Sequence, residues 1–466
     1  MRIAINTAND VARLHHRYWP ARRAITRSAA TPGVQRKLVS SFAIASGRAA
    51  SDRRHHRPPT PGDAVGPARP RAGPLSFNAP AGRQPRADPN GDAVRSIRRP
   101  SKVNAAPART LDTLLDGRGN SLTFVRLVAA VAVIVSHSFP IVMGVGAKEP
   151  LAGISAFNLG QHAVNAFFVI SGFTLSNSLS RRQPLPSFLA ARILRIFPGL
   201  FMLGVMFAFF IGPYLTSLTV EDYFSDAHTF LYPLAILVQF NEAVPPHGLF
   251  ETVPYPDNVN EPLWTIRYEL AAYAGLVIAT AIGLFRSAAG LALSCLAILA
   301  LYGLVTSKPA LTGDIQGFYN LSRFAICFMI GVVAYRFRRE IRLSALIAFL
   351  LLGGTALLAA TPLAGVASMI TVAYLVFCVG ALSFGAVGDW VDRNDMSYGT
   401  YLYGWPIQQS LISIWPSLPV LALIAVAAPL AMLAGLLSWS LVEKPALRLK
   451  RSRSMDGDAS RQASKP

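Results

Sequence analysis

Ten long apolar stretches dominate the chain from residue 121 onward and limit what it can fold into. Each runs for about 18–24 residues, which is long enough for a helix to cross a hydrocarbon core of about 30 Å. Because every backbone N–H and C=O in lipid needs a partner within the protein, these stretches are expected to be helices. Their ranges are 122–142, 159–179, 196–215, 263–284, 287–306, 318–336, 343–361, 365–386, 398–415 and 419–441. The predicted fold is an all-α integral membrane protein with about ten transmembrane helices.

The composition agrees with a membrane protein and excludes two other classes. Hydrophobic residues make up 52% of the chain and charged residues only 15%, whereas a soluble domain carries about 25% charged residues. This hydrophobicity excludes a wholly disordered chain. The three cysteines, Cys295, Cys327 and Cys378, each lie inside an apolar run, which indicates small buried residues rather than a disulfide scaffold. A shorter apolar run, 229–240, is expected to lie at the membrane interface or to re-enter the membrane.

Most of the basic charge belongs to an N-terminal tail. Residues 1–110 hold 21 Lys and Arg against 5 Asp and Glu, whereas the remaining residues hold 23 against 19. The tail also holds 13 of the 33 prolines, and it is expected to be disordered. A transit peptide, a basic arm that touches anionic lipid or nucleic acid, and translation upstream of the true start are the alternatives. The predicted domains are a disordered basic tail, 1–115, a transmembrane domain, 116–445, and a short cytoplasmic basic tail, 446–466.

Lysine and arginine residues gather in three of the connecting segments. These segments follow the second, sixth and tenth apolar stretches, around Arg181, Arg338 and Lys444. The long loop 216–262 has no Lys or Arg and carries seven acidic residues. The positive-inside rule therefore places both termini and the three basic segments in the cytoplasm, and the acidic loop outside. The predicted location is the cell (inner) membrane.

Six ionisable residues lie inside the predicted spans, where a charge costs roughly 2.5–3.5 kcal/mol to insert. They are Arg126, His137, His162, Arg267, Glu269 and Arg323. Arg126 and His137 are separated by about three helical turns, which brings them to within about 20° on one face and about 16 Å apart along the axis. In the predicted orientation Arg126 lies near the cytoplasmic end and His137 toward the outside. This layout suits a tunnel through the helix bundle.

Two of these residues have the chemistry of an acid–base pair. The imidazole of His137 titrates in the range that proton transfer requires, and a structural histidine near the interface is the alternative. Glu269 is predicted at a comparable depth, where it is able to pair with His137. Arg267 lies about 200° from Glu269 around the helix, so Glu269 needs a partner on another span. An ion pair between Arg323 and Glu269 is the alternative to a functional role for either residue.

Arg192 and Arg195 form a second candidate site just before the third span. At a spacing of three they share a helix face at the predicted cytoplasmic boundary. Two guanidinium groups there suit phosphates, and ordinary positive-inside anchoring is the alternative. The sequence has no P-loop, dinucleotide fingerprint, CxxC or HExxH motif, so no metal site or bound cofactor is expected. Basic and aromatic residues are too sparsely interleaved for a nucleic-acid partner.

Six motifs, in order, give the chain a resemblance to a known family. They are SLTFVRLVAAVAVIVSH (121–137), NAFFVISGF (165–173), SFLAARILRIFP (187–198), VNEPLWTIRYELAAY (259–273), SYGTYLYGWPI (397–407) and SLVEKPALR (440–448). With these motifs the chain resembles the acyltransferase-three family of multi-spanning membrane acyltransferases, which includes bacterial O-acetyltransferases of surface polysaccharides. The resemblance runs from about Ser121 to Pro445.

The resemblance implies specific roles for these residues. His137 matches the family's essential histidine, and Arg126 matches its arginine partner. Arg192 and Arg195 match the pair that holds the phosphates of coenzyme A, and Glu269 matches a carboxylate of the fourth motif. The candidate substrate-binding residues are Asn165, Trp264 and Tyr268. The implied donor is cytoplasmic acyl-CoA, with acetyl as the default acyl group.

The chain departs from the family pattern at three places. The Asp of the opening motif is missing before Arg126, a single glutamate, Glu269, stands where many members have two, and Gly404 stands where many have a late histidine. His137 must therefore work without a second histidine at that position.

The predicted function is transfer of an acyl group, by default acetyl, from acyl-CoA to a hydroxyl group of a cell-surface or lipid-linked carbohydrate. His137 is expected to act as general base, and Glu269 to orient its imidazole. An acyl-histidine intermediate is an alternative path. The alternative function is a multi-spanning transporter or exporter, because ten spans with buried charges also fit that class.

Overall fold

The computed structural model describes residues 110–115, 121–150, 152–181, 184–307 and 315–449. These residues form helices joined by loops and contain no β-strand, which confirms the all-α prediction. Most of the predicted N-terminal tail and of the predicted C-terminal tail lies outside the described residues.

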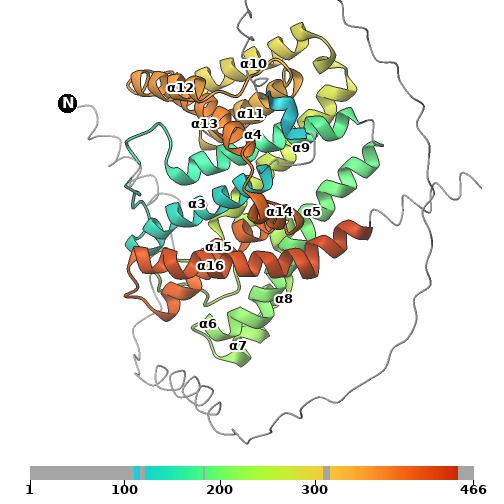
Figure 1. Ribbon diagram of the computed structural model, residues 1–466. Coiled ribbons are helices and arrows are strands. Elements are labelled where there is room, and N and C mark those ends of the chain that lie inside the picture. Colours follow the sequence, from blue (N-terminus) through green and yellow to red (C-terminus); the bar gives the residue numbers. More distant parts are fainter. Residues whose placement is uncertain (1–109, 116–120, 151, 182–183, 308–314, 450–466) are drawn as a thin grey trace, which may run out of the picture. The chain divides into compact units, whose positions relative to one another are not determined.

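Helices account for every one of the ten apolar stretches (Figure 1). The longer helices are α3 (Leu122–Met143), α4 (Leu159–Ser180), α5 (Leu185–Val205), α8 (Ala227–Gln239), α9 (Ile266–Ala281), α10 (Ala288–Ser307), α11 (Ile315–Arg336), α12 (Ala345–Leu357), α13 (Ala364–Gly380), α15 (Ser397–Ile414) and α16 (Val420–Ser438). The shorter elements are η1 (Leu111–Leu115), η2 (Met206–Ile211), α6 (Gly212–Leu215), α7 (Val220–Ser225), η3 (Phe240–Glu242), η4 (Glu261–Thr265), η5 (Leu284–Arg286), α14 (Gly385–Arg393) and η7 (Trp439–Glu443).

Five of these helical segments are long and apolar enough to cross a membrane, so ten spans are not confirmed. The five are Leu122–Met143, Leu185–Leu215, Ala288–Ser307, Gln316–Arg336 and Val420–Leu449. The helices α13 and α14 would add a sixth as a pair, but the chain bends by 106° between them. The helix α12 has only 13 residues, and α4 carries Gln161, His162 and Asn165, which lower its hydropathy.

Helix α11 packs on α4, α4 packs on α3, and α3 packs on α15 and α16 (Figure 1). The α4–α11 contact is the most extensive in the described part of the chain. A Cβ atom on Gly172 would lie only 2.0 Å from the carbonyl oxygen of Phe328, and one on Gly331 only 2.2 Å from that of Val169. Glycine is therefore required on both helices, because any side chain would force the backbones apart.

The end of the predicted tail belongs to the helical domain. Residues Leu111–Leu115, which the sequence assigns to the disordered tail, instead form η1, with Leu111 and Leu114 almost fully buried. The carboxylate of Asp112 pairs with Arg338 at 2.7 Å and with Arg339 at 3.2 Å, both just after α11. Buried leucines and paired charge hold this segment, and neither is visible in the composition of the tail as a whole.

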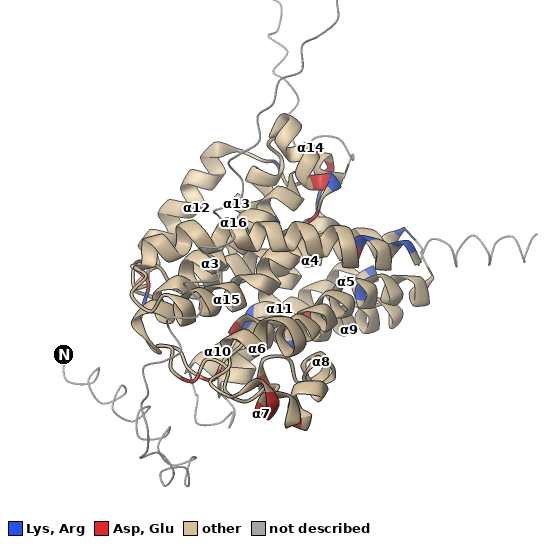
Figure 2. Ribbon diagram, turned by 90° about the horizontal axis from the view of Figure 1, so that it is seen from below, with Lys and Arg blue, Asp and Glu red and all other residues tan. Residues whose placement is uncertain are grey.

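Charged residues gather at helix ends and in loops, and long stretches of helix carry none (Figure 2). Acidic residues lie around α7, and basic residues lie beyond the end of α16. This distribution suits helices whose middle sections face lipid, because a charge at membrane depth is costly. Some charged residues lie within the helices, away from their ends. These residues line internal cavities and form the candidate site.

Candidate functional site

An arginine-lined cavity of about 490 Å³ lies where the beginnings of α3 and α5 meet the ends of α4 and α16. We call it the arginine cavity. Its charged lining residues are Arg126, Arg181, Arg192, Arg195, Glu269 and Asp395. Both arginines of the predicted phosphate site thus face the same cavity, together with Arg126.

Arg195 is already neutralised by carboxylates. Its Nη2 lies 2.6 Å from Oδ2 of Asp395, and its Nη1 lies 2.8 Å from Oε2 of Glu443. Asp395 also accepts a hydrogen bond at 3.0 Å from Nη1 of Arg126. Two cations therefore share one aspartate, and a second carboxylate completes the cluster. We call Arg126, Arg195, Asp395 and Glu443 the paired cluster.

Local backbone geometry brings the two carboxylates of this cluster inward. The C-terminal end of α16 widens to a π-helix over Trp439–Glu443, and π-helical turns often occur at functional sites. Glu443 is fully buried there and accepts a hydrogen bond at 2.9 Å from Ser438. Asp395 lies in the turn between α14 and α15, where the Ser397 hydroxyl donates to it at 2.6 Å.

The charge of Asp395 follows from its neighbours. Burial raises the pKa of its carboxyl, but the opposing effects of Arg126, Arg195 and the Ser397 hydrogen bonds are together stronger and lower the pKa to about 2. The aspartate is therefore ionised at neutral pH, as an ion-pair partner must be.

Arg192 differs from Arg195, although both line the arginine cavity. Its guanidinium packs over the ring of Phe188 at 5.8 Å, and its buried Nε has no hydrogen-bond partner. No carboxylate forms an ion pair with Arg192 within the described residues. Of the predicted pair, Arg192 is thus the guanidinium that has donors available for an anionic ligand.

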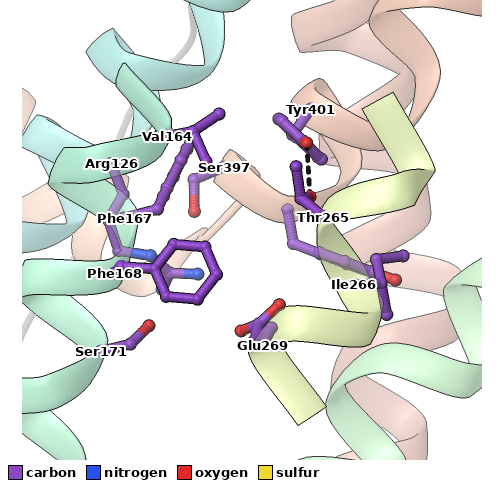
Figure 3. Close-up of a pocket in the computed structure, with 11 residues that line it drawn as sticks. Arg126, Val164, Phe167, Phe168, Ser171, Thr265, Ile266, Glu269, Ser397 and Tyr401 are labelled. Atoms are coloured by element: carbon purple, nitrogen blue, oxygen red, sulfur yellow. Dashed lines mark hydrogen bonds between the residues drawn. The ribbon is translucent and has the colours of Figure 1, made fainter. Parts of the chain in front are cut away.

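A small cavity of about 60 Å³ continues inward from the arginine cavity (Figure 3). We call it the connecting cavity. Arg126 and Ser171 lie on one side of it, and Thr265 and Glu269 on the other. Tyr401 closes one end, where its hydroxyl lies 2.8 Å from that of Thr265.

A third cavity, of about 330 Å³, contains His137. We call it the histidine cavity. It is lined by the end of α3, the beginning of α4 and loop residues around Lys148 and Tyr255. The ring of His137 packs edge-on against Trp405, with ring centroids 5.1 Å apart. Trp405 in turn contacts the ring of Tyr255 at 4.8 Å, so an aromatic wall fixes one side of the imidazole.

Shared walls join the three cavities into one series. Four residues line both the arginine and the connecting cavities: Arg126, Ser171, Glu269 and Tyr398. Three residues line both the connecting and the histidine cavities: Val164, Thr265 and Tyr401. One helix, α3, carries Arg126 at one end of this series and His137 at the other. The layout is the one that the spacing of these two residues suggests.

The expected pairing of Glu269 with His137 is not formed. Glu269 accepts a hydrogen bond from the hydroxyl of Tyr273 on its own helix and lines the arginine and connecting cavities. Carboxylates that do line the histidine cavity belong to Glu149 and Glu261. Glu269 is in the first turn of α9, and this turn lies one cavity away from His137. The predicted depth of Glu269 in the membrane did not show which neighbouring helix its side chain would face.

Arg267 and Glu269 face different ways, as their spacing predicts. Arg267 pairs with Glu242 and also donates at 3.1 Å to Asn241. The expected alternative of an ion pair between Arg323 and Glu269 is wrong, because Arg323 lines the histidine cavity. Arg323 is 1% exposed.

The three candidate substrate-binding residues lie in different surroundings. Trp264 lines the histidine cavity and stacks on Phe324 at 5.6 Å. Tyr268 lies behind it and lines an apolar cavity of about 340 Å³ between α9, α10 and α11. Asn165 is buried in α4, and both polar atoms of its amide lack hydrogen-bond partners. Trp264 alone of the three is placed beside His137.

Several residues of the site escape sequence reasoning. Glu443 could have been predicted, because it belongs to the closing motif at the end of the last apolar stretch. Asp395 belongs to none of the six motifs and could not have been predicted in this way. The space of the missing late histidine is filled: a Cβ on Gly404 would lie 2.7 Å from Cγ1 of Ile134 on α3. No group of three or more metal-ligating side chains is present in the described part of the chain.

Comparison with known proteins agrees with this architecture. The acyltransferase domain family matches residues 120–442. An "O-acetyl transferase" of Shigella phage Sf6 is 27% identical over 343 residues, which cover 70% of this chain and 96% of the phage protein. "Nodulation protein 10" of Rhizobium leguminosarum bv. viciae is 28% identical over 361 residues, which cover 72% and 95%. No solved structure matches the chain.

Proposed function

The chain belongs to the acyltransferase domain family and is an O-acyltransferase, and on that premise we propose that it moves an acetyl group from acetyl-CoA to a hydroxyl group of a cell-surface or lipid-linked carbohydrate. The observation that carries this proposal is the series of three cavities between Arg192 and His137. The series offers an anion-binding end, a narrow middle and an end with a base. The name of the phage relative supports acetyl as the group transferred.

The donor binds in the arginine cavity. Arg192 offers free guanidinium donors to the phosphates of coenzyme A, and the exposed Arg181 at the same cavity adds a second positive charge. The sequence predicts that both Arg192 and Arg195 hold phosphate, but we assign this role to Arg192 and not to Arg195. The charge of Arg195 is balanced within the paired cluster. Arg195 is a positioning residue that fixes Asp395 and, through it, Arg126.

Reaction takes place where the connecting cavity meets the histidine cavity. The imidazole of His137 accepts the proton of the acceptor hydroxyl as its oxygen attacks the thioester carbonyl carbon. The carbon–sulfur bond breaks, the thiolate of coenzyme A leaves, and the proton on His137 passes to it or to solvent. Thr265 and Tyr401 line the opening through which the thioester reaches this point.

The two ends of the cavity series face opposite sides of the membrane. The arginine cavity is lined by helix ends next to the basic segments, and the histidine cavity by residues next to the acidic loop. By the positive-inside rule the donor enters from the cytoplasm and the acceptor waits outside. The protein is then a multi-pass protein of the cell (inner) membrane, with ten spans and both termini in the cytoplasm. The helices too short for a straight span cross as bent or protein-surrounded segments.

The test uses membranes that contain the full-length protein and radiolabelled acetyl-CoA. Label is expected to reach extracted glycan or lipid-linked glycan with the unchanged protein and to be lost with His137→Ala. The matched control is His228→Ala, since His228 is an exposed histidine of the acidic loop, and it should transfer label normally. Transfer that survives His137→Ala contradicts the assigned base. Movement of sugar without consumption of acetyl-CoA would indicate a transporter instead.

A further inference from the structure

One buried arginine in the histidine cavity has no counter-ion. Arg323, on α11, is 1% exposed and lines the cavity together with His137. No carboxylate forms an ion pair with it within the described residues. Two of its nitrogens, Nε and Nη1, are buried without any hydrogen-bond partner. An uncompensated charge in the interior is costly, and in a membrane protein it marks a functional site.

Aromatic rings surround the guanidinium, whose Nε and Nη1 remain without a hydrogen-bond partner. Its Cζ lies 4.5 Å from the ring centroid of Phe324, 5.4 Å from that of Phe157 and 5.8 Å from that of Tyr319. These cation–π contacts stabilise the positive charge and hold the guanidinium in place. The Tyr319 side chain also hydrogen-bonds to the guanidinium. Ring faces accept no strong N–H hydrogen bond in the guanidinium plane, so Nε and Nη1 are held in place without an acceptor atom from the described residues.

The other charged groups of the cavity are occupied elsewhere. Glu149 accepts a hydrogen bond from the backbone N–H of Leu159, at the start of α4. Glu261 accepts a hydrogen bond from the side chain of Asn258. The remaining cation, Lys148, lies in the loop that lines the cavity. The histidine cavity therefore holds two cations, Arg323 and Lys148, and two carboxylates that each accept a hydrogen bond from another part of the protein.

We propose that the acceptor is anionic, and that Arg323 binds its carboxylate or phosphate group while one of its hydroxyls faces His137. This inference rests on the proposed function and names the class of its substrate. A guanidinium donates strong, charge-assisted hydrogen bonds to carboxylate and phosphate oxygens, and an oxygen of such a group would satisfy one of the two unpartnered nitrogens. Trp264, in the same cavity, offers an aromatic face to the sugar ring.

Two sources supply such a group, namely a sugar acid within the glycan and a phosphate that links the sugar to lipid. The test is binding of three probes to the purified full-length protein in detergent at constant ionic strength: glucuronate, glucose 1-phosphate and glucose. Thermal unfolding against probe concentration gives an apparent affinity for each. Preference for glucuronate assigns the charge to a sugar acid, and preference for glucose 1-phosphate assigns it to a phosphate.

At least one anionic probe is expected to bind about tenfold more tightly than glucose. Arg323→Gln should remove most of this difference, and Arg323→Lys, which keeps the charge and loses the planar fork, should retain part of it. Arg286→Gln, at an exposed position outside the three cavities, is the matched control and should leave sugar binding unchanged. Equal binding of all three probes, or an unchanged preference in Arg323→Gln and Arg323→Lys, overturns the proposal.

The response to coenzyme A separates this inference from the proposed function. Coenzyme A should stabilise Arg323→Gln as it does the unchanged protein, and it should stabilise Arg192→Gln less. If labelled acetyl-CoA gives no transfer while Arg323-dependent sugar binding persists, the proposed acetyl transfer fails, and the inference that Arg323 binds an anionic ligand is retained. If transfer occurs to neutral glycan at the same rate with Arg323→Gln, acyl transfer stands and the anionic acceptor is excluded.

Discussion

Arg195 is mostly buried and Arg323 fully buried, both lie in helices and both face the same series of cavities, yet their surroundings are opposite. Arg195 has two carboxylate partners within 2.8 Å, and it also packs over the ring of Trp439 at 5.1 Å. Arg323 has aromatic neighbours and no ion pair among the described residues. A charge whose partners come from the protein holds helices together, whereas a charge without partners is available to a ligand. By this difference Arg195 is a structural arginine at one end of the site, and Arg323 is a binding arginine at the other.

The largest effect is expected from breaking the paired cluster. Arg195→Met leaves Glu443 fully buried without its cation, and loss of one partner of a buried ion pair costs about 3–5 kcal/mol. The unfolding temperature in detergent should therefore fall strongly. Glu340→Gln, at an exposed site outside the cluster, is the control and should leave it unchanged. A loss for Arg195→Met no greater than that for Arg323→Met would remove the distinction between the two arginines.

An intermediate effect is expected from pH, through Asp395. Its folded-state pKa of about 2 lies below the ordinary value of 3.8, so the ionised carboxylate stabilises the fold by about 2 kcal/mol at neutral pH. A depressed pKa gives stability that is present above the unfolded value and is lost as pH falls toward the folded value. The unchanged protein should therefore lose this contribution between about pH 4 and pH 2.

The check is the difference in unfolding temperature between the unchanged protein and Asp395→Asn across this range. The difference should be constant from pH 7 to about pH 5 and shrink below it. A difference that stays constant down to pH 2 would mean that Asp395 is not held ionised by Arg126 and Arg195.

The smallest effect on stability is expected at Arg323. Arg323→Met keeps most of the side-chain volume and removes a buried charge without leaving a carboxylate unpaired. Replacing a buried charge by an apolar side chain of similar size is often neutral or stabilising, so the change should be within about 1 kcal/mol. The same variant should lose the preference for anionic sugars. A strongly destabilised Arg323→Met would show that Arg323 has a structural role instead.

Relations along one helix could be predicted from the sequence. The angular period of a helix fixes the shared face of Arg126 and His137 and the opposed faces of Arg267 and Glu269, and the structure places all four accordingly. Length and apolar content located all the helices of the ten stretches, and the six motifs indicated the family that the comparison confirms.

Relations between helices could not be predicted in this way. The rotation and tilt of α9 against α3 decide that Glu269 lines the same cavities as Arg126 and not the cavity of His137. Helix α11 turns Arg323 toward the histidine cavity instead of toward Glu269. These settings depend on packing, for example on the close approach at Gly172. Asp395 escaped prediction for the same reason, since its partners come from α3 and α5, far away in sequence.

If the arginine and histidine cavities are two ends of one reaction site, narrowing the connection between them should stop acyl transfer without changing binding at either end. Val164 lines both the connecting and the histidine cavities, so Val164→Phe should obstruct the passage. Val128→Phe, at a half-exposed position of α3, is the control. The measurement is transfer of labelled acetyl groups, alongside the thermal response to coenzyme A and to the anionic sugar. Val164→Phe is expected to keep both binding responses and to reduce transfer by about a hundredfold, which corresponds to an increase of about 2.7 kcal/mol in the activation barrier. Undiminished transfer in a folded Val164→Phe protein would contradict a shared reaction site.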